Sequence, residues 1–310
     1  MAPGIYVIHE NSDWLPPFAL AFSRRGIEFE DWDLTERAFE LTRPPPQGVF
    51  YNRMSASSHT RGHRFSPELT SAVLAWLEGH GRRVINSSRA LQLEVNKSAQ
   101  LAALQACGIP VPRTIAAVGA SKLVDATDVF AGDPVIVKPN RGGKGLGVKL
   151  IEDRRVMREL ALEDALGSSV DGITLIQQYI RPADGLITRA EFIGGRFHYA
   201  ARIDTSMGFE LCPADVCVSE ADPMGVSFVI VNDINAELKR RIELFLGINK
   251  IDIAGVEFST DVHGVSYVYD VNTNTNYNAV AEAAAGCDAA QAVIDFLIAE
   301  RNRIYDRMAA

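Results

Sequence analysis

The segment PVIVKPNRGGKGLGVKLIED (residues 134–153) decides the fold. Its first seven residues form an apolar run typical of a buried strand, and the run from Val148 predicts a second strand. Between them, glycines at positions 142, 143, 145 and 147 let backbone N–H groups wrap an anion, while Lys138 and Lys144 add positive charge. The segment therefore predicts a flap over phosphate groups between two antiparallel strands. The alternative is a plain flexible hairpin turn.

Two other phosphate-binding motifs do not fit this segment. No serine or threonine follows Lys144, so it does not match the P-loop pattern GxxxxGK[ST]. A dinucleotide-binding turn leads from a strand into a helix, whereas a strand-like run follows this loop. The strand on each side of the loop therefore excludes both motifs.

A group of oxygen-bearing side chains lies further along, in AGVEFSTD (254–261) and VSYVYDVN (265–272). Strand alternation puts Glu257 on one strand, and Asp270 and Asn272 on one face of the next. Two carboxylates and an amide oxygen suit Mg²⁺ held against a nucleotide, and the alternative is a polar surface hairpin. Asparagines recur at 272, 274, 276 and 278, a spacing suited to directed hydrogen bonds, which makes Asn274 a candidate substrate contact.

The first ninety residues predict a small α/β unit. Apolar runs predict strands at 4–9, 27–34, 48–54 and 83–88, with helices at 17–26 and 68–81 and a proline loop at 44–46. This alternation favours a parallel sheet covered by helices. Beyond it we expect helices at 87–107, 155–166 and 236–250, strands at 174–180, 188–194 and 197–203, and a helical tail from Ala279 interrupted at Gly286.

Three motifs, in this order, carry a resemblance: KPNRGGKGLGV (138–148), LIQQYI (175–180) and AGVEFS…YVYDVNTNTN (254–276). Together they resemble the ATP-grasp superfamily, and most closely the RimK-type amino-acid ligases, over roughly residues 85–300. Glutathione synthetase and D-alanine–D-alanine ligase are more distant relatives. The resemblance implies an α+β protein with the ATP-grasp fold and an α/β N-terminal part. Its expected domains are a small parallel-sheet leading domain (1–88), a lid subdomain with the glycine loop (89–180) and a C-terminal subdomain with the metal site (181–310).

The resemblance also implies roles for individual residues. The segment NKSAQLAALQACGIPVPRT (96–114) looks like the family's lysine-bearing helix. The resemblance implies that Arg202 contacts the transferred phosphate and the acylphosphate. Arg189 is a second candidate for this contact, and we place it at the substrate. The residues implied at ATP are Lys97, Lys138, Gly142, Gly143, Lys144, Gly145 and Gly147 at the phosphates, and Gln177, Gln178, Tyr179 and Ile180 at adenine. Those implied at Mg²⁺ are Glu257, Asp270 and Asn272.

Three positions depart from the family pattern. The hinge has Gln177-Gln178 where relatives often carry a glutamate, so adenine contacts rest more on the backbone. The metal pair is Glu257 then Asp270, whereas an aspartate followed by a glutamate is usual. RimK-type ligases tend to have an acidic residue before the arginine at 189, and here Asp184 is the candidate for the ribose contact.

A basic segment (52–64) follows the third predicted strand. It carries arginines at 53, 61 and 64 with His59 and His63, and this positive charge would attract an anionic substrate. Loops at the carboxyl ends of parallel strands commonly bind ligands, and the candidate substrate contacts are Asn52, Arg53, His59 and Arg61. The alternative is a solvated basic loop. A zinc pair at His59 and His63 is disfavoured, because Arg61-Gly62 between them is poor helix.

Composition restricts the partners. The 310 residues include 31 Lys and Arg against 39 Asp and Glu, a net charge of −8, which argues against a nucleic-acid partner. No apolar run reaches the roughly 20 residues of a membrane span, and the start lacks the regions of a secretory signal. The scattered cysteines match no zinc or disulfide spacing and are interpreted as structural thiols. We expect a cytoplasmic protein with a small-molecule or peptide substrate, and leave homo-oligomerisation open.

The function implied by the resemblance is ATP-dependent ligation of a carboxylate to an amine through an acylphosphate, with release of ADP and phosphate. The cofactors would be ATP and one or two Mg²⁺ ions, with Mn²⁺ as an alternative metal. The alternatives are a catalytically silent nucleotide-binding regulatory or scaffold protein and an enzyme of another reaction type, such as a ring-closing ligase or a kinase.

Overall fold

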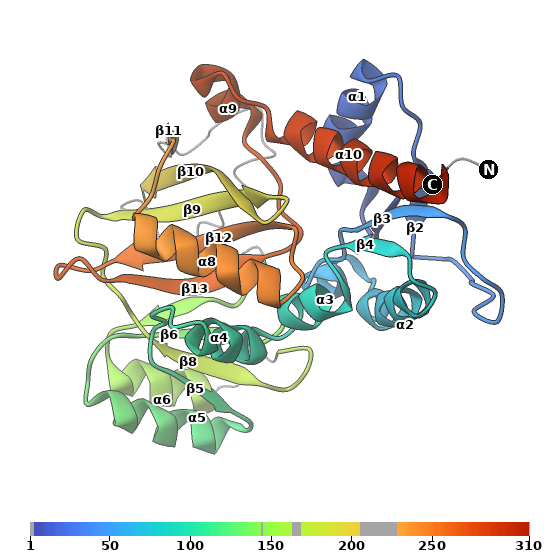
Figure 1. The fold of residues 1–310 in the computed structure, drawn as a ribbon. Coiled ribbons are helices and arrows are strands. Elements are labelled where there is room, and N and C mark those ends of the chain that lie inside the picture. Colours follow the sequence, from blue (N-terminus) through green and yellow to red (C-terminus); the bar gives the residue numbers. More distant parts are fainter. Residues whose placement is uncertain (1–2, 144, 163–168, 205–227, 310) are drawn as a thin grey trace.

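The computed structural model describes residues 3–143, 145–162, 169–204 and 228–309, and these form three β-sheets with their covering helices (Figure 1). One sheet is parallel and the other two are antiparallel. This combination is the α+β architecture with an α/β leading part that the sequence predicts. No helix in the described part of the chain is long and apolar enough to cross a membrane.

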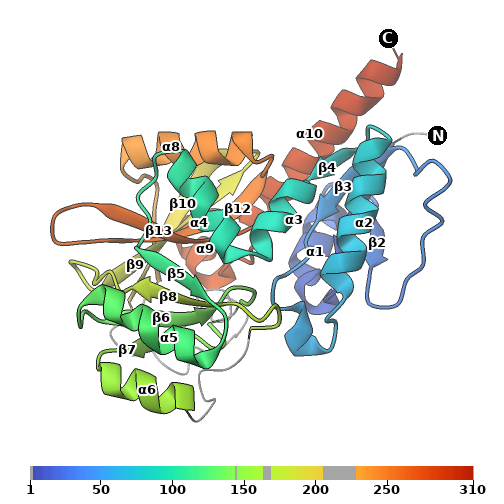
Figure 2. The ribbon, with the colours of Figure 1, turned by 90° about the horizontal axis from the view of Figure 1, so that it is seen from below.

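The first sheet has the strand order β2-β1-β3-β4, and all its neighbours are parallel, as predicted. Its strands are β1 (Gly4–His9), β2 (Glu30–Asp33), β3 (Gly48–Asn52) and β4 (Arg83–Ile85). Alternate residues of β1 face opposite sides, so Ile5 and Val7 pack against α1 (Pro16–Arg24) and α10 (Ala289–Ala309). Tyr6 and Ile8 pack against α2 (Ser66–Gly79) on the other side (Figure 2).

The helix expected at 87–107 is two helices, α3 (Ser88–Glu94) and α4 (Lys97–Ala106). The side chain of Ser87 accepts a hydrogen bond from the backbone N–H of Ala90, and Asn96 does the same for Ala99, so each helix has its own N-cap. The second cap ends the continuous helix that apolar periodicity predicts. As a consequence, Lys97 is the first residue of α4.

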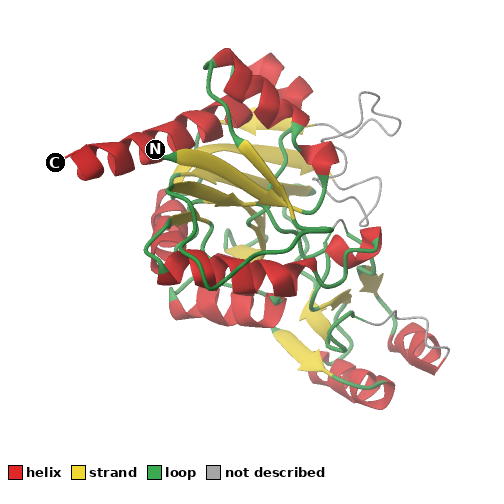
Figure 3. Ribbon diagram, turned by 90° about the vertical axis from the view of Figure 1, so that its right-hand side faces the viewer, coloured by secondary structure: helices red, strands yellow, loops and turns green. Residues whose placement is uncertain are grey.

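The middle sheet has the order β5-β8-β6-β7, from β5 (Thr114–Ala117), β8 (Thr174–Gln178), β6 (Val135–Pro139) and β7 (Lys149–Ile151). Strands β6 and β7 are antiparallel neighbours, so the glycine-rich loop joins two antiparallel strands as predicted. Helices α5 (Ala120–Thr127) and α6 (Arg154–Leu162) accompany this sheet, and the group projects from one end of the molecule (Figure 3). Strand β5 and helix α5 were not predicted.

The third sheet has the order β11-β10-β9-β12-β13. Its strands are β9 (Leu186–Ile193), β10 (Arg196–Asp204), β11 (Phe228–Val231), β12 (Ile253–Thr260) and β13 (Ser266–Asn272). Helix α8 (Ala236–Ile248) packs on one face, and α9 (Ala279–Ala285) follows β13. On the other face, register partners form a row across all five strands: Ile230, Ala201, Arg189, Glu257 and Asp270. The domain boundaries at residues 88 and 180 stay a prediction.

Candidate active site

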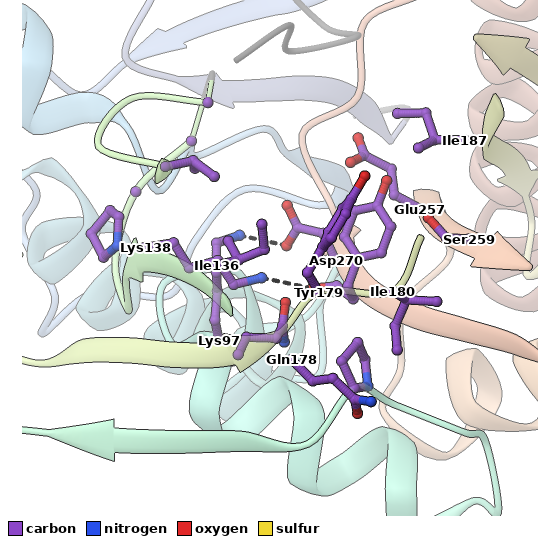
Figure 4. Close-up of a pocket in the computed structure, with 18 of the residues that line it drawn as sticks. Lys97, Ile136, Lys138, Gln178, Tyr179, Ile180, Ile187, Glu257, Ser259 and Asp270 are labelled. Carbon is purple, nitrogen blue, oxygen red and sulfur yellow. Dashed lines mark hydrogen bonds and ion pairs between the residues drawn. The ribbon is translucent and has the colours of Figure 1, made fainter. Parts of the chain in front are cut away.

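A pocket lies between the middle and third sheets, under the glycine-rich loop (Figure 4). It brings together twelve of the residues expected to bind nucleotide or metal, from segments that are far apart in the chain. These are Lys97, Lys138, Gly142, Gly143, Gly145, Gln177, Gln178, Tyr179, Ile180, Glu257, Asp270 and Asn272. Lys144 lies outside the described residues, as do Cys212 and Cys217, and Gly147 is not among the described lining residues.

The pocket has apolar lining residues that suit a flat base. Its lining includes Pro112, Ile136, Leu146, Val148, Ile180 and Ile187. The two hinge glutamines are bound to the middle sheet itself, since Gln177 Nε2 donates to Thr114 Oγ1 at 2.9 Å and Gln178 Oε1 accepts from the N–H of Arg113 at 3.5 Å. Their side chains therefore stabilise the hinge, and adenine contacts through its backbone stay a prediction.

The pocket also carries opposite charges at close range. Lys97 Nζ is paired with Asp270 Oδ1, and Lys138 Nζ donates to the carbonyl oxygen of Tyr269 at 3.2 Å. Burial alone would lower the pKa of Lys97, but the Asp270 carboxylate outweighs it and the pKa is raised. Burial and then the charge of Lys97 lower the pKa of Lys138 to about 8. The ammonium groups of Lys97 and Lys138 can therefore bind phosphate oxygens.

Arg189 holds the carboxylate of Glu257. Its guanidinium donates from Nη1 to Glu257 Oε1 at 2.9 Å, from Nε to Glu191 Oε1 at 2.7 Å and from Nη2 to Thr275 Oγ1 at 2.6 Å. The side chains of Arg189, Glu191 and Glu257 are all less than a tenth exposed. Burial raises the pKa of Glu257, and the Arg189 charge opposes this shift. Arg189, expected at the substrate, is thus fully engaged with protein groups.

The two pocket carboxylates suit a hard cation. Glu257 and Asp270 are register partners on β12 and β13, as strand alternation predicts, and Asn272 Nδ2 donates to Glu257 Oε1 at 3.3 Å. The described residues contain no group of three or more His, Cys, Asp or Glu side chains that could hold a metal alone. A site of two carboxylates and one amide oxygen therefore fits Mg²⁺ that takes its remaining ligands from phosphates and water.

Two buried glutamates near the pocket escaped the sequence analysis. Glu94 Oε2 accepts from the N–H of Thr273 at 2.7 Å and Oε1 from the N–H of Ala56 at 3.3 Å, so it ties the end of β13 to the leading domain. Burial raises its pKa. Glu191 could have been found, because it lies two residues after Arg189 and so on the same face of β9. Glu94 carries no such signal, since a glutamate on a helix is usually exposed.

The basic segment 52–64 is mostly occupied by protein contacts. Asn52 is 1% exposed and its Nδ2 donates to the carbonyl of Asn86, while Arg53 is also 1% exposed. The expectation that Asn52 and Arg53 contact substrate is therefore corrected: they are structural. Arg61 donates to both oxygens of the buried Glu10, at 2.5 and 3.2 Å. Its charge is compensated, and its role at substrate stays a prediction.

His59 lies among three arginines of this region. Burial lowers the pKa of His59, although a hydrogen bond to the Ala56 backbone opposes the shift; the charges of Arg141, Arg61 and Arg64 lower it further. Arg141, from the glycine-rich segment, donates from Nη1 to Glu68 Oε1 at 2.8 Å and so connects the lid to the leading domain. The substrate role of His59 also stays a prediction.

Arg202 and Asp184 do not line the pocket in the described structure. Arg202 on β10 is the register partner of Thr188, which precedes Arg189 on β9. Because side chains alternate between the two faces of a sheet, the side chain of Arg202 leaves its strand on the face opposite that of Arg189. It is ion-paired with Asp184, and both side chains are partly exposed. This placement corrects the expected contacts with the transferred phosphate and the ribose. Asn274 is likewise not among the described lining residues.

Replacing Gly255 with alanine is expected to weaken Mg²⁺-dependent activity by about ten- to a hundredfold. A Cβ atom at this position of β12 would lie 2.7 Å from Nη2 and 2.8 Å from Nε of Arg189, whose three hydrogen bonds prevent easy withdrawal. The displaced guanidinium would release Glu257. The measurement is the Mg²⁺ concentration dependence of ADP release. Gly247→Ala in α8, where nothing lies within 4 Å, is the control; an unchanged Mg²⁺ dependence in Gly255→Ala would contradict the assignment.

ATP binding is expected to weaken as the pH rises through about 8, where Lys138 loses its proton. Phosphate favours the charged ammonium, so above this pH binding must take up a proton, and affinity falls by up to about tenfold per pH unit. Calorimetric titration with a non-hydrolysable ATP analogue, below and above this pH, measures the effect. Lys138→Arg keeps its charge and should give a flatter profile. Equal pH dependence in both proteins would argue against a phosphate contact.

Comparison with known proteins agrees with this geometry. Residues 93–202 match the family described as the RimK-like ATP-grasp domain. The probable alpha-L-glutamate ligase 2 of Shewanella baltica is 26% identical over 234 residues, which cover 76% of this chain and 72% of the relative. The ATP-grasp ligase PsnB complexed with minimal precursor has a TM-score of 0.69 at 21% identity, over 96% of this chain and 99% of that chain. The D-cycloserine synthetase DcsG has a TM-score of 0.66 at 18% identity, over 97% and 100%.

The matched residues 93–202 include Lys97, Lys138, the glycine-rich loop and the hinge. The strands that carry Glu257 and Asp270 complete the same pocket. Residues 93–202 therefore match the RimK-like ATP-grasp domain, and the chain has the fold of the solved ATP-grasp ligases.

Proposed function

We propose that this protein is an ATP- and Mg²⁺-dependent ligase that joins a carboxylate to an amine and releases ADP and phosphate. The observation that carries the proposal is the pocket itself. It places two buried lysines, the buried carboxylate of Glu257 and the half-buried carboxylate of Asp270 beneath a glycine-rich loop, together with apolar lining residues. Phosphoryl transfer needs this kind of positioning and charge neutralisation more than covalent help from the protein.

The reaction has two steps. A substrate carboxylate oxygen attacks the γ-phosphorus, the bond to the β–γ bridging oxygen breaks, and ADP leaves. The amine nitrogen then attacks the acyl carbon, the carbon–oxygen bond to phosphate breaks, and the amine loses a proton. Lys97 and Lys138 would stabilise the phosphate charge, and Glu257, Asp270 and Asn272 would hold Mg²⁺, which neutralises charge on the phosphates.

The proposed substrates are an amino acid or a peptide. The named relatives support this class, since one is called a probable alpha-L-glutamate ligase and PsnB is complexed with the precursor peptide PsnA2. We further propose that the protein acts in the cytoplasm, accepts Mn²⁺ in place of Mg²⁺, and has no nucleic-acid or membrane partner, in keeping with its net charge of −8. Self-association is not part of the proposal.

Hydroxylamine trapping tests the proposal. Purified protein, Mg-ATP and pools of amino acids and small peptides are incubated with hydroxylamine, and hydroxamate and ADP are quantified together. The expected result is hydroxamate equal to ADP in one pool, because hydroxylamine intercepts the acylphosphate. ADP without hydroxamate would indicate a kinase or an ATPase. Binding of Mg-ATP with no ADP in any pool would favour the non-catalytic nucleotide-binding alternative.

A further inference from the structure

Asn140 lies between the end of β6 and the glycine-rich loop, and it is fully buried. Its side chain is hydrogen-bonded at both ends. Oδ1 accepts from the N–H of Ser98 at 2.8 Å and from Ser98 Oγ at 2.7 Å, and Nδ2 donates to Asp171 Oδ2 at 2.6 Å. Packing alone would favour an apolar side chain at a buried position, so this asparagine is matched to its polar partners.

The start of α4 depends on Asn140. A helix leaves its first N–H groups without partners inside the helix. In α4 the N–H of Lys97 donates to the carbonyl oxygen of Asn140 at 3.2 Å, and the N–H of Ser98 donates to Oδ1 of the same asparagine. The next N–H, that of Ala99, is bound by the Asn96 cap. One residue from outside the helix therefore binds both N–H groups that the cap does not reach.

Asn140 is also fixed to the strand that carries the other phosphate lysine. Lys138 lies two residues earlier, on β6. The N–H of Asn140 donates to the carbonyl oxygen of Ile173 at 3.0 Å, which continues the pairing of β6 with β8. Asp171 Oδ1 accepts from the N–H of Ile173 at 3.1 Å, so the side-chain partner of Asn140 is held at the same place. A shift of Lys138 along its strand would therefore break the contacts of Asn140.

The two lysine side chains converge on adjacent residues of β13. Lys97 Nζ is paired with Asp270, and Lys138 Nζ donates to the carbonyl oxygen of Tyr269. Both lysines are buried, so a displaced backbone would carry its ammonium group with it. The spacing of the two ammonium groups is thus set by the junction between α4 and β6, and Asn140 forms that junction.

From this arrangement we infer that Asn140 is a positioning residue for the phosphate site. It sets the distance between Lys97 and Lys138, so that both ammonium groups meet the same polyphosphate. Asn140 is not among the described lining residues of the pocket, so it acts through the lysines. The inference rests on the proposed function, because it takes the two lysines as phosphate contacts, but nucleotide binding can be measured without turnover.

The test is a double-mutant cycle of nucleotide affinity, measured by calorimetry on the full-length protein with Mg²⁺. ADP carries phosphates and adenosine does not. Asn140→Ala should weaken ADP binding by about tenfold and leave adenosine binding unchanged. In the Lys97→Met background the same substitution should change ADP affinity by less than about twofold, because the ammonium group that Asn140 positions is gone.

Asn249→Ala is the matched control. Asn249 is also a buried asparagine bonded at both ends of its side chain, since Oδ1 accepts from Arg89 Nε at 3.1 Å and Nδ2 donates to the carbonyl oxygen of Phe245 at 2.9 Å. It lies at the end of α8 and is not among the described lining residues of the pocket. The Asn249→Ala protein should bind ADP and adenosine as the wild type does, although the same kind of bonds is lost.

An exchange of two side chains keeps the test decisive if Asn140→Ala does not fold. Asn140→Asp alone places a second carboxylate against Asp171 and should weaken ADP binding by about tenfold. Asn140→Asp combined with Asp171→Asn restores a donor between the two side chains and the total charge. This exchanged protein should bind ADP within about threefold of the wild type. Thermal melting verifies that each variant is folded.

Four outcomes would overturn the inference. They are wild-type ADP affinity in Asn140→Ala, equal losses for ADP and adenosine, the same loss of ADP affinity in the Lys97→Met background, and no recovery in the exchanged protein. Absence of hydroxamate together with a cycle of the expected form would count against the proposed function alone. The two failures are therefore distinguishable.

Discussion

Asp270→Asn is expected to lower kcat by about a thousandfold, in the range seen when a group that stabilises transition-state charge is removed. Asp270 lies among the charged groups of the pocket, where it is ion-paired with Lys97 and is the register partner of Glu257. Burial would raise its pKa, but the charges of Lys97 and Lys138 outweigh burial and lower it, so Asp270 is ionised at neutral pH. An asparagine supplies an oxygen but not the negative charge that would hold Mg²⁺.

The measurement is kcat for ADP release with the substrate found by hydroxylamine trapping. The Asp270→Asn protein should still fold, because the carboxylates of Glu94 and Glu257 also attract the charge of Lys97. Thermal melting verifies that it is folded. Asp306→Asn, at an exposed position near the end of α10, is the matched control and should leave kcat unchanged. An Asp270→Asn protein with wild-type kcat would disprove the assignment of Asp270 to the metal.

Arg53→Ala is expected to lower the free energy of unfolding by about 3–5 kcal/mol. The buried guanidinium donates to the carbonyl of Trp14 at 3.0 Å, to the carbonyl of Thr275 at 3.1 Å and to Asn276 Oδ1, and its carbon lies 4.2 Å from the centre of the Phe18 ring. Alanine would leave three acceptors without their donor and a cavity between the leading domain and the segment after β13. Chemical denaturation followed by circular dichroism measures the loss.

Arg43→Ala is the control for this prediction. Arg43 lies in the proline-containing loop with its side chain 78% exposed, so its removal should change stability by less than about 0.5 kcal/mol. If Arg53→Ala were as stable as the wild type and only raised the KM of the substrate, the structural role of Arg53 would be disproved. Arg53 would then be a substrate contact.

Much of the pocket could be predicted from the sequence because its parts have local signals. The glycine-rich loop lies between two short apolar runs, and a loop in that context can only join neighbouring strands. Glu257, Asp270 and Asn272 follow strand alternation on a hairpin, and the pairing of Glu257 with Asp270 places them together. Backbone periodicity within a few residues is enough for such predictions.

The wrong predictions concern side chains whose surroundings come from distant segments. Arg53 is a candidate substrate contact from its sequence alone, but its partners Thr275 and Asn276 are more than 200 residues away in sequence. Arg202 was assigned by resemblance, and the strand register puts it on the other face from Arg189. The break between α3 and α4 was missed because the Asn96 cap lies inside an otherwise helical pattern.

The last helix of the chain has a consequence for how the protein is made. Val293, Ile294 and Leu297 of α10 cover the face of the first sheet that Ile5, Val7 and Tyr51 present, and Arg25, the C-cap residue of α1, is ion-paired with Asp295. During translation these strands emerge from the ribosome long before α10 exists, so their apolar face stays exposed to water until α10 is made. The leading domain is therefore made first but completes its folding only after α10 has emerged. A nascent chain arrested before residue 289 should be the form that chaperones bind most strongly.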